Sequence, residues 1–334
     1  MTKKAILLAN LGSPDKPKTK EVRKYLNQFL SDPYVIHLPW LLRRIIVSLF
    51  ILPARPKMSA KAYQSIWTKE GSPLLFLSEQ LKQAVQAKLD CPVAMSMRYG
   101  KPSIKKQLLS LVKEQGVTEI LFIPLYPHYA ESTVTTSVEE AKRVIKKFKL
   151  KVSLQVQQPF YQHDNYISAL VNSAQPYLQQ PYDHLLFSYH GLPEVHISKL
   201  DQSKKHCLKT VACCTKPHKA HKTCYRHQVF QTTRCFAEKA NLPAGKYSVA
   251  FQSRLGRAKW LGPSTEQRLR ELAENGVKNV LVICPSFVTD CLETLEEIAI
   301  RGQQVFKEAG GETLTLIPCL NDNEEWVDTL VSWC

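Results

Sequence analysis

The sequence predicts an α/β protein built from two similar Rossmann-like domains, each with a four-stranded parallel sheet flanked by helices. Short, almost uninterrupted apolar segments alternate with amphipathic stretches, as in parallel sheets that helices cover on both faces. In each half of the chain, the second, third and fourth apolar segments follow at intervals of roughly thirty residues, the length of one strand–helix–strand unit. A longer excursion separates the first segment from the second in both halves, so we interpret the chain as a duplicated fold.

Eight apolar segments are predicted to be the strands. They cover residues 5–10, 93–99, 119–125 and 151–157 in the first half, and residues 184–190, 247–253, 279–285 and 313–318 in the second. Between them, apolar side chains recur at helical spacing. This spacing predicts helices over residues 78–89, 104–114, 138–147, 166–178, 266–274 and 292–308. Regular alternation of strand and helix is typical of doubly wound α/β domains.

The domain boundary is expected near residue 160. At 334 residues the chain can supply two cores of ordinary size, an N-terminal domain over 1–160 and a C-terminal domain over 161–334. Each domain carries one long insertion after its first strand. The first insertion contains the apolar lip segment 33–53 and the second the cysteine-rich segment 204–227. The last helix, within 322–334, is expected to pack back on the first domain.

Composition narrows the function classes. Hydrophobic residues make up 44% of the chain and charged residues 22%, as in a soluble globular protein. The net charge of +16 suggests nucleic acid, but no helix-turn-helix, zinc-finger or RNA-binding aromatic signature accompanies it, so no nucleic-acid partner is expected. Anionic lipid headgroups, a small substrate that carries carboxylates, and a lysine-rich solvated surface all remain compatible with the charge.

The N-terminal apolar stretch is too short for an export signal and runs directly into a turn at residues 12–14. Ten cysteines without an export signal indicate a reducing compartment, where structural disulfides are not expected. The chain is therefore expected to be cytoplasmic, with peripheral contact to the inner face of the cell membrane as an option.

The lip segment 33–53 is the most hydrophobic part of the sequence. It is not expected to span a membrane, because Pro39 interrupts it and because Arg43 and Arg44 would each cost roughly 2.5–3.5 kcal/mol at the centre of a bilayer. Two interpretations stay open. The segment lies among lipid headgroups with Trp40 and the two arginines as anchors, or it is a buried helix that closes a cleft.

His190 stands at the end of the predicted strand 184–190. Gly191 and Pro193 force the chain to turn directly after it, which leaves the imidazole at the edge of the sheet. Ligands of open parallel sheets bind at this carboxyl edge, and an ordinary histidine pKa of about 6.5 suits proton acceptance near neutrality. The alternative is a structural histidine held by hydrogen bonds.

A row of carboxylates begins the helix predicted after strand 279–285. Glu293 and Glu297 stand one turn apart, and Glu296 adjoins them. Carboxylates at a helix N-terminus are common for electrostatic reasons alone, and this reading stays open. If they share an edge with His190, the group can accept protons from a substrate and bind a divalent metal.

With these segments assembled, the chain resembles the ferrochelatases, which insert Fe²⁺ into a porphyrin at the end of haem synthesis. The resemblance runs from end to end. It rests on LGSP at 11–14, GSPL at 71–74, MRYG at 97–100, YPHY at 126–129, SYHG at 188–191, FQSR at 251–254, WLGP at 260–263 and DCLETLEE at 290–297. The family fold, two chelatase-like Rossmann domains, agrees with the duplicated pattern above.

The resemblance implies a role for each matching residue. His190 and Glu293 would flank the point of metal insertion, and Glu297 would lie further along an iron or proton path, in a helix that contains a π-helical turn. The lip would match the membrane-facing mouth of the family. The substrates would be Fe²⁺ and protoporphyrin IX. Six residues match positions that line the porphyrin pocket: Leu11, Arg55, Tyr63, Tyr126, Trp260 and Phe287.

The cysteine-rich segment contains a C-x5-C-C-x9-C pattern made by Cys207, Cys213, Cys214 and Cys224. Four thiolates are the number that a [2Fe–2S] cluster requires, and some ferrochelatases are similar in carrying such a cluster on internal cysteines. A structural zinc site is the alternative, in which one of the nearby histidines 206, 218, 221 or 227 replaces a cysteine. A third possibility is a loop without metal.

Other functions remain as alternatives. Within the enzyme class, the substrate would be coproporphyrin, or another tetrapyrrole that receives a different metal such as cobalt. Outside it, the same cleft would bind porphyrin or haem as a carrier without turnover. The sequence does not indicate an oligomeric state.

Overall fold

The structure is a computed structural model that describes residues 2–254, 256 and 258–334. Contacts within the chain divide it into two compact units. The first comprises the residues up to Tyr126, Ala130–Gln158 and Val327–Cys334. The second comprises Pro127–Tyr129 and Pro159–Trp326. Helix α13 (Glu324–Val331) contributes residues to both.

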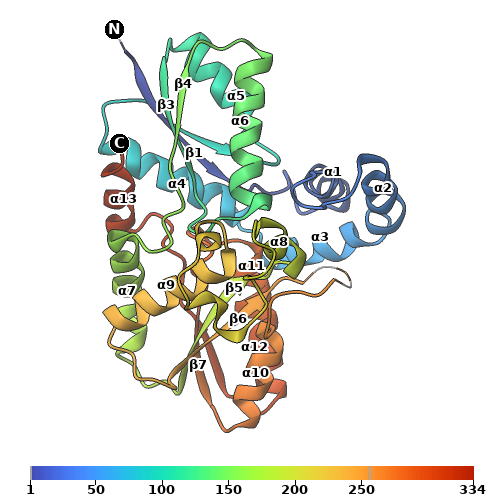
Figure 1. The fold of residues 1–334 in the computed structure, drawn as a ribbon, viewed down its shortest axis with the longest axis vertical. Helices are drawn as coiled ribbons and strands as arrows, with labels where there is room; N and C mark the ends of the chain where they lie inside the picture. The colour runs from blue at the N-terminus through green and yellow to red at the C-terminus, as the bar shows by residue number, and fades with distance from the viewer. Residues whose placement is uncertain (1, 255, 257) are drawn as a thin grey trace. The chain divides into compact units, whose positions relative to one another are not determined.

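The first unit contains a parallel sheet of four strands in the order β2-β1-β3-β4 (Figure 1). These are β1 (Lys4–Asn10), β2 (Val93–Met97), β3 (Glu119–Pro124) and β4 (Ser153–Val156). The central strand β1 is buried from Ala5 onward, because it has a neighbour on each side and helices over its faces. Helices α4 (Pro73–Ala87), α5 (Ile104–Leu109) and α6 (Thr136–Lys147) follow the strands.

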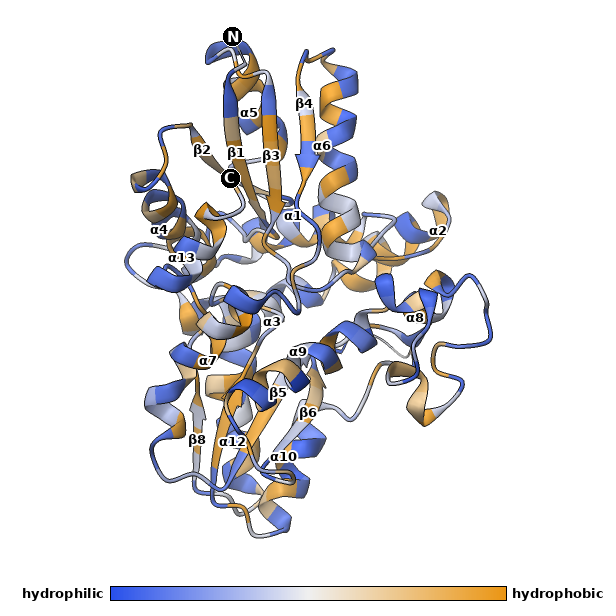
Figure 2. Ribbon diagram, turned by 60° about the vertical axis from the view of Figure 1, so that its left-hand side comes forward, coloured by the Kyte–Doolittle hydropathy of each residue, from blue (hydrophilic) through white to orange (hydrophobic). Residues whose placement is uncertain are grey.

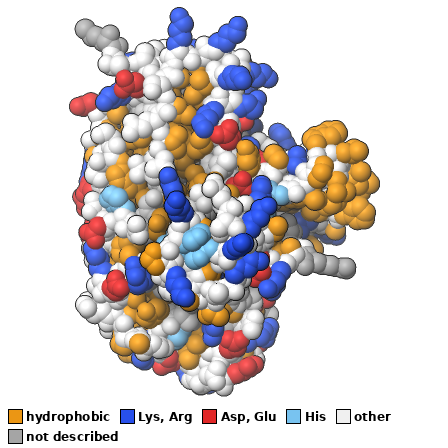
Figure 3. All heavy atoms as spheres, viewed as in Figure 1, with side chains coloured by type: hydrophobic (Ala, Val, Ile, Leu, Met, Phe, Trp, Pro, Cys, Tyr) orange, Lys and Arg blue, Asp and Glu red, His pale blue; other side chains and the backbone are white. Residues whose placement is uncertain are grey.

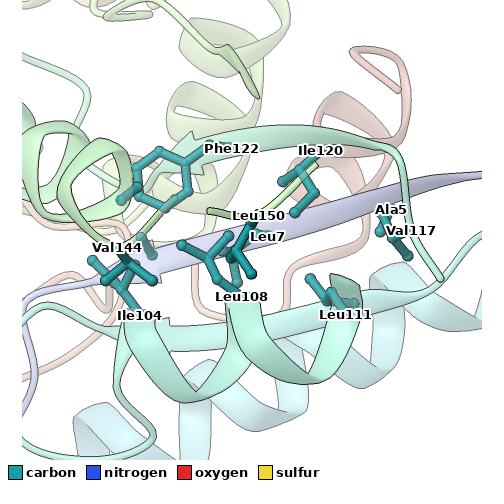
Figure 4. Packing of buried hydrophobic residues seen from close by; sticks show 12 residues of the cluster. Ala5, Leu7, Ile104, Leu108, Leu111, Val117, Ile120, Phe122, Val144 and Leu150 are labelled. Carbon is teal, nitrogen blue, oxygen red and sulfur yellow. The ribbon is translucent and has the colours of Figure 1, made fainter. Parts of the chain in front are cut away.

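The core of this unit lies between the sheet and the helices α5 and α6. Leu7 and Phe122 project from the strands toward Leu108 and Val144 of the helices (Figure 4). Helix α6 alternates apolar and polar residues around its axis (Figure 2), which is the amphipathic pattern of a helix with one face on a sheet. Helix α5 continues into a π-helical turn, η2 (Ser110–Glu114).

The long insertion of the first unit is helical. It contains α1 (Thr19–Leu30), α2 (Trp40–Ile45), a π-helical turn η1 (Ile46–Ile51) and α3 (Arg55–Ile66). Apolar side chains gather on the surface over α2 and η1 (Figure 3). The strongly exposed ones are Trp40, Leu41, Leu42, Ile45, Leu49, Phe50 and, on α3, Met58. The segment is therefore not a buried helix.

The expectation that Arg43 anchors the lip from its outer surface is wrong. Arg43 is buried and its Nη1 donates hydrogen bonds to the carbonyls of Leu38, at 2.7 Å, and Ile36, at 3.4 Å. Arg44 Nη1 donates to Asn27 Oδ1 of α1 at 2.9 Å. Arg43 thus supplies donors to backbone carbonyls that precede α2, and Arg44 links α2 to side chains at the end of α1.

The second unit repeats the topology of the first. Its parallel sheet has the order β6-β5-β7-β8, made by β5 (His184–His190), β6 (Tyr247–Gln252), β7 (Asn279–Ile283) and β8 (Thr313–Leu316). Helices α7 (Asp164–Leu178), α9 (Tyr225–Lys239), α10 (Thr265–Glu274) and α12 (Gln303–Glu308) accompany it. Leu186 and Val282 of the sheet pack with Leu269 of α10 and Phe306 of α12. The predicted fold class and the eight predicted strands are confirmed.

The cysteine-rich insertion of this unit contains only short helices. These are α8 (Glu194–Leu200) and two 3₁₀ turns, η4 (Val211–Cys214) and η5 (Lys219–Lys222). The predicted helix over 292–308 forms in three parts, α11 (Leu292–Thr294), a π-helical stretch η6 (Leu295–Gly302) and α12. Among the residues that the structure describes, a helix with the length and hydropathy of a membrane span does not occur.

Candidate active site

His190 is the last residue of β5, and its ring has a defined tautomer. Its Nδ1 lies 2.6 Å from the carbonyl oxygen of Gly191. Because a carbonyl only accepts, Nδ1 must carry the hydrogen, and Nε2 of the neutral ring is left as the proton acceptor. The ring packs beside Phe287 with centroids 6.2 Å apart. The turn after the strand is tight, since a side chain at Gly191 would lie 2.8 Å from the carbonyl oxygen of Gln252.

The start of helix α11 is held by side chains that precede the carboxylates. The backbone N–H of Cys291 donates to Thr294 Oγ1 at 3.0 Å, within a capping box. Thr294 Oγ1 also donates to the buried carboxylate of Asp290 at 2.9 Å. Asp290 accepts a further bond from Asn321 Nδ2 at 2.8 Å. These contacts fix where the helix begins and thus where Glu293 stands.

Glu293 and Glu297 lie along α11 and η6, and they are contacted by the last residue of β6, Gln252, and by the following Ser253. Gln252 Nε2 donates to the carbonyl oxygen of Glu293 at 2.6 Å. Ser253 Oγ donates to Glu297 Oε2 at 2.5 Å. Arg301 lies 3.4 Å from Glu297, so the acidic row ends in an ion pair. The π-helical turn that the resemblance implied is confirmed in η6, a form of helix that occurs frequently at functional sites.

The environment opposes charge on both His190 and Glu293. Burial lowers the pKa of His190, and the negative charge of Glu293 offsets only part of that effect. Burial raises the pKa of Glu293, and the charge of Glu297 raises it further. The two groups act on each other electrostatically, so the imidazole and the carboxyl titrate as a pair. Both shifts favour the uncharged forms, a neutral imidazole that can accept a proton and a carboxyl that can hold one.

Two residues at this edge were not singled out from the sequence. Tyr225 donates its phenol hydrogen to the carbonyl oxygen of His190 at 2.8 Å. The same hydroxyl lies 2.9 Å from Ser286 Oγ, which accepts the N–H of His190 at 3.4 Å. Side-chain bonds to a backbone leave no sequence pattern. The one feature of the sequence that could have drawn attention to Tyr225 is its position directly after Cys224, a predicted cluster ligand.

The six residues matched to a porphyrin pocket fall in both units. In the second unit, Phe287 is partly exposed beside His190, and Trp260 pairs through its backbone with Pro193. In the first unit, Leu11 and Tyr126 follow the neighbouring strands β1 and β3. Of the two on α3, Arg55 is exposed and begins the helix, whereas Tyr63 is buried with its ring 6.5 Å from that of Tyr25.

The four cysteines of the insertion come together. All four are buried, and the sulfurs of Cys213 and Cys214 are 3.9 Å apart. The Cys224 thiol interacts with those of Cys207 and Cys214. Its interaction with Cys214, together with burial, raises the pKa of Cys214, and burial raises the pKa of Cys207. Arg226 Nη1 donates to the sulfurs of Cys213 and Cys214 at 3.5 and 3.3 Å.

The four nearby histidines, His206, His218, His221 and His227, contact one another and the backbone of the cysteine group. They stack in two pairs with centroids 3.8 and 3.7 Å apart. His206 and His221 hydrogen-bond the backbone carbonyl of Cys213, not a sulfur. Across the described part of the chain, no three or more His, Cys, Asp or Glu side chains are arranged to hold a metal ion. The insertion thus places four buried thiols close together, with the guanidinium of Arg226 beside two of the sulfurs.

Comparison with solved structures shows which known fold the chain shares. The fold is similar to that of SirB from Bacillus subtilis with Fe³⁺, with a TM-score of 0.54, 15% sequence identity, and coverage of 99% of this chain and 94% of that one. It is also similar to the sirohydrochlorin chelatase SirB from Bacillus subtilis subspecies spizizenii in complex with cobalt, with a TM-score of 0.55, 12% identity and coverage of 99% and 93%. The fold is that of the chelatases.

Sequence comparison identifies the family. The ferrochelatase family model matches residues 3–334. The chain is 56% identical over 335 residues to ferrochelatase of Pseudomonas syringae pv. tomato, which covers 100% of this chain and 98% of the relative. It is 53% identical over 336 residues to that of Azotobacter vinelandii, with 100% and 99% coverage. The chain belongs to the ferrochelatase family and is a metal-inserting enzyme of haem biosynthesis, as the resemblance implied.

Proposed function

We propose that the protein inserts Fe²⁺ into protoporphyrin IX to form protohaem, with His190 as proton acceptor and Glu293 as its partner. The observation that carries this proposal is the arrangement of His190. Its Nδ1 hydrogen is committed to Gly191, so Nε2 is the acceptor, and the Glu293 carboxyl acts on it electrostatically. Imidazole and carboxylate are suitable transient ligands for Fe²⁺, because an incomplete set of protein ligands allows the metal to pass on.

The reaction requires two protons to leave the pyrrole nitrogens as one Fe²⁺ enters. A planar porphyrin hides its nitrogen lone pairs, so a site that binds the buckled macrocycle more tightly than the flat one lowers the barrier. His190 Nε2 would accept a pyrrole proton, and Glu293, whose pKa is raised by burial, would take up the second proton or hold the iron. Proton acceptance by a positioned base contributes about 10²–10⁴-fold to such a step.

Glu297 would be the next group after Glu293 to bind the iron or a proton on its path. Its carboxylate accepts a bond from Ser253 and pairs with Arg301, which bounds the acidic row on that side. An acidic relay beyond Glu297 is therefore not part of the proposal. The assignment of porphyrin contacts to the six matched residues rests on the resemblance alone. They are Leu11, Arg55, Tyr63, Tyr126, Trp260 and Phe287.

The cysteine group would hold a [2Fe–2S] cluster on Cys207, Cys213, Cys214 and Cys224, with zinc as the alternative metal. Such a cluster supplies structure or redox sensitivity, because metal insertion itself transfers no electron. Replacing Cys213 and Cys214 by Ser is expected to bleach the visible absorption and remove the bound iron of the purified protein. Retention of colour and iron in that variant would overturn this ligand assignment, and a colourless protein that contains zinc would support the alternative.

The lip would contact a membrane surface through its exposed apolar residues. Phe50 is 72% exposed and Leu49 66% exposed. Side chains of this kind on a short helical segment are suited to the interface between headgroups and acyl chains. The contact would be peripheral.

The substrate is tested by anaerobic Fe²⁺ insertion into protoporphyrin and coproporphyrin measured side by side, with Co²⁺ as a second metal. We expect turnover with protoporphyrin, and its loss in His190→Ala while porphyrin still binds. Preference for coproporphyrin would show instead that the protein is a coproporphyrin ferrochelatase. Tight porphyrin binding without turnover in the unaltered protein would favour a carrier, and undiminished activity of His190→Ala would remove that residue from the mechanism.

A further inference from the structure

The first turn of helix α9 contacts both the cysteine group and the backbone of His190. Cys224 immediately precedes the helix and joins the thiol network. Tyr225, the first helical residue, donates to the His190 carbonyl at 2.8 Å. Arg226 donates to two cysteine sulfurs, and His227 Nδ1 bonds the Cys214 carbonyl at 2.8 Å. Four successive residues, 224–227, therefore connect the two regions: Tyr225 contacts the end of β5, and the other three contact the cysteine-rich insertion.

The ring of Tyr225 is fixed in place. The residue is 5% exposed, and the ring of His128 packs edge-on against it with centroids 5.6 Å apart. His128 Nε2 in turn bonds Thr232 Oγ1, two turns further along α9, at 2.9 Å. Burial lowers the pKa of His128 to about 3, so this packing contact is uncharged at neutral pH. The phenol oxygen consequently has one position relative to α9.

The phenol oxygen of Tyr225 bonds the peptide group between His190 and Gly191. The tautomer of the His190 ring depends on this peptide, because Gly191 accepts the Nδ1 hydrogen. Tyr225 bonds the carbonyl of His190, and Ser286 bonds both the N–H of His190 and the phenol. The next residue, Gly191, accepts the Nδ1 hydrogen of the imidazole through its own carbonyl. A shift of the 190–191 peptide would therefore change where Nε2 points and how closely the ring approaches its partner Glu293.

We propose that Tyr225 is a positioning residue for His190 and that it transmits the order of the cysteine-rich insertion to the site of proton transfer. This inference rests on the proposed function, in which His190 is the proton acceptor. A base moved by a fraction of a bond length loses much of its effect on rate. Removal of the Tyr225 hydroxyl should therefore lower kcat strongly and change the affinity for porphyrin only slightly.

The test compares Tyr225→Phe with a matched control, Tyr189→Phe. Tyr189 is also buried and directly precedes His190, but its hydroxyl bonds Thr233 Oγ1 at 2.8 Å instead of the catalytic backbone. We expect Tyr225→Phe to lower kcat by about 5- to 50-fold, with the porphyrin KM within twofold and the limb of the pH–rate profile that belongs to His190 shifted. Tyr189→Phe should leave kcat and the profile unchanged at comparable Tm.

Ser286→Ala provides a second test if Tyr225→Phe folds poorly. It should lower kcat in the same manner, and the double variant should lose less than the product of the two single losses, because both groups act through one peptide. Normal kcat in Tyr225→Phe or in Ser286→Ala, beside an inactive His190→Ala, would overturn the positioning role alone. An active His190→Ala would instead overturn the proposed function.

The proposed connection between the cysteine-rich insertion and His190 can be tested without measuring activity. Arg226→Gln removes the donor to the two sulfurs, and hydrogen–deuterium exchange then reports on the backbone at residues 190–191. We expect faster exchange there than in the unaltered protein, and no further increase when Arg226→Gln is added to Tyr225→Phe. Unchanged exchange at 190–191 with faster exchange confined to the insertion would contradict the link.

Discussion

The Glu293 carboxyl is held in surroundings that disfavour its charge. Burial is the main cause, and the neighbouring Glu297 adds repulsion. The folded-state pKa therefore lies above the ordinary value of about 4.3. For a group of this kind, the stability it contributes is fully present below the ordinary pKa and is lost as the pH rises through the folded-state pKa. The native protein thus gives up stability at neutral pH to keep a proton-accepting carboxylate beside His190.

Replacing Glu293 by Gln should raise the thermal stability of the protein while abolishing iron insertion. The amide keeps the shape of the side chain but cannot ionise, so the gain in Tm over the unaltered protein should be larger at pH 8 than at pH 5. Thermal unfolding at both pH values measures it. Glu274→Gln, on the exposed end of α10, is the control and should show no such pH-dependent difference. A Tm gain independent of pH would contradict the explanation.

At the scale of residues, the sequence singled out His190 because it ends a predicted strand, and Glu293 because it begins the helix that follows another strand. The carboxyl edge of a parallel sheet is defined by the strands themselves. Tyr225 and Ser286 could not be predicted, since their contacts with the His190 backbone depend on how α9 and the loop after β7 pack. Arg43 was misjudged for a related reason: buried backbone carbonyls, which leave no trace in the sequence, determine its orientation.

The loop after β1 approaches the loop after β2 very closely. Gly12, after β1, has a φ of 109°, and a side chain there would lie 1.8 Å from the carbonyl oxygen of Tyr99, after β2. No small adjustment of backbone atoms relieves such a clash. This close approach explains why a glycine occupies the first loop, next to Leu11.

Gly12→Ala should prevent the first unit from folding normally, with a loss of several kcal/mol, as expected when both φ and space are incompatible with a side chain. Gly116→Ala is the matched control. Gly116 also has a positive φ, 70°, but open space where the side chain would go, so its cost should be only about 1–2 kcal/mol. Urea unfolding of both variants provides the comparison. Equal, small losses would show that the clash is relieved by movement of the loops.

At the scale of elements, the strands could be predicted because continuous apolar runs are rare outside buried parallel sheets. The π-helical stretch η6 was not visible in the apolar pattern of residues 292–308, which is compatible with an ordinary helix; only the family resemblance implied it. Within η6, Glu297 contacts Ser253, which follows β6, and Arg301 in the next turn. Contacts of this kind between distant segments are not encoded in the apolar pattern.

At the scale of the whole chain, both sheets have the same strand order, so each unit presents its loops at the same edge of its own sheet. This repetition explains why motifs spread over the entire sequence follow strand ends. It was predictable from the spacing of the apolar segments. The exposure of the lip was not predictable, because an amphipathic apolar segment has the same sequence pattern whether it is buried or lies on a surface.

Leu49→Glu combined with Phe50→Glu should abolish binding to vesicles of anionic lipid, since it places charge on two strongly exposed apolar side chains of the lip. Binding of the unaltered protein should weaken with salt, because the net charge of +16 adds a screened attraction. Vesicle flotation at low and high salt measures both effects. Insertion of iron into soluble porphyrin should be unchanged, and vesicle binding that survives the double change would exclude the lip as the contact.

The central expectation is that His190 and Glu293 act as one unit when the pyrrole protons are removed. A double-mutant cycle on kcat for Fe²⁺ insertion, with His190→Ala, Glu293→Gln and the double variant, tests this directly. We expect each single change to lower kcat by about 10²-fold or more, and the double change to cost little beyond the larger single loss. Losses that multiply, or substantial activity in either single variant, would contradict a shared role in removing the pyrrole protons.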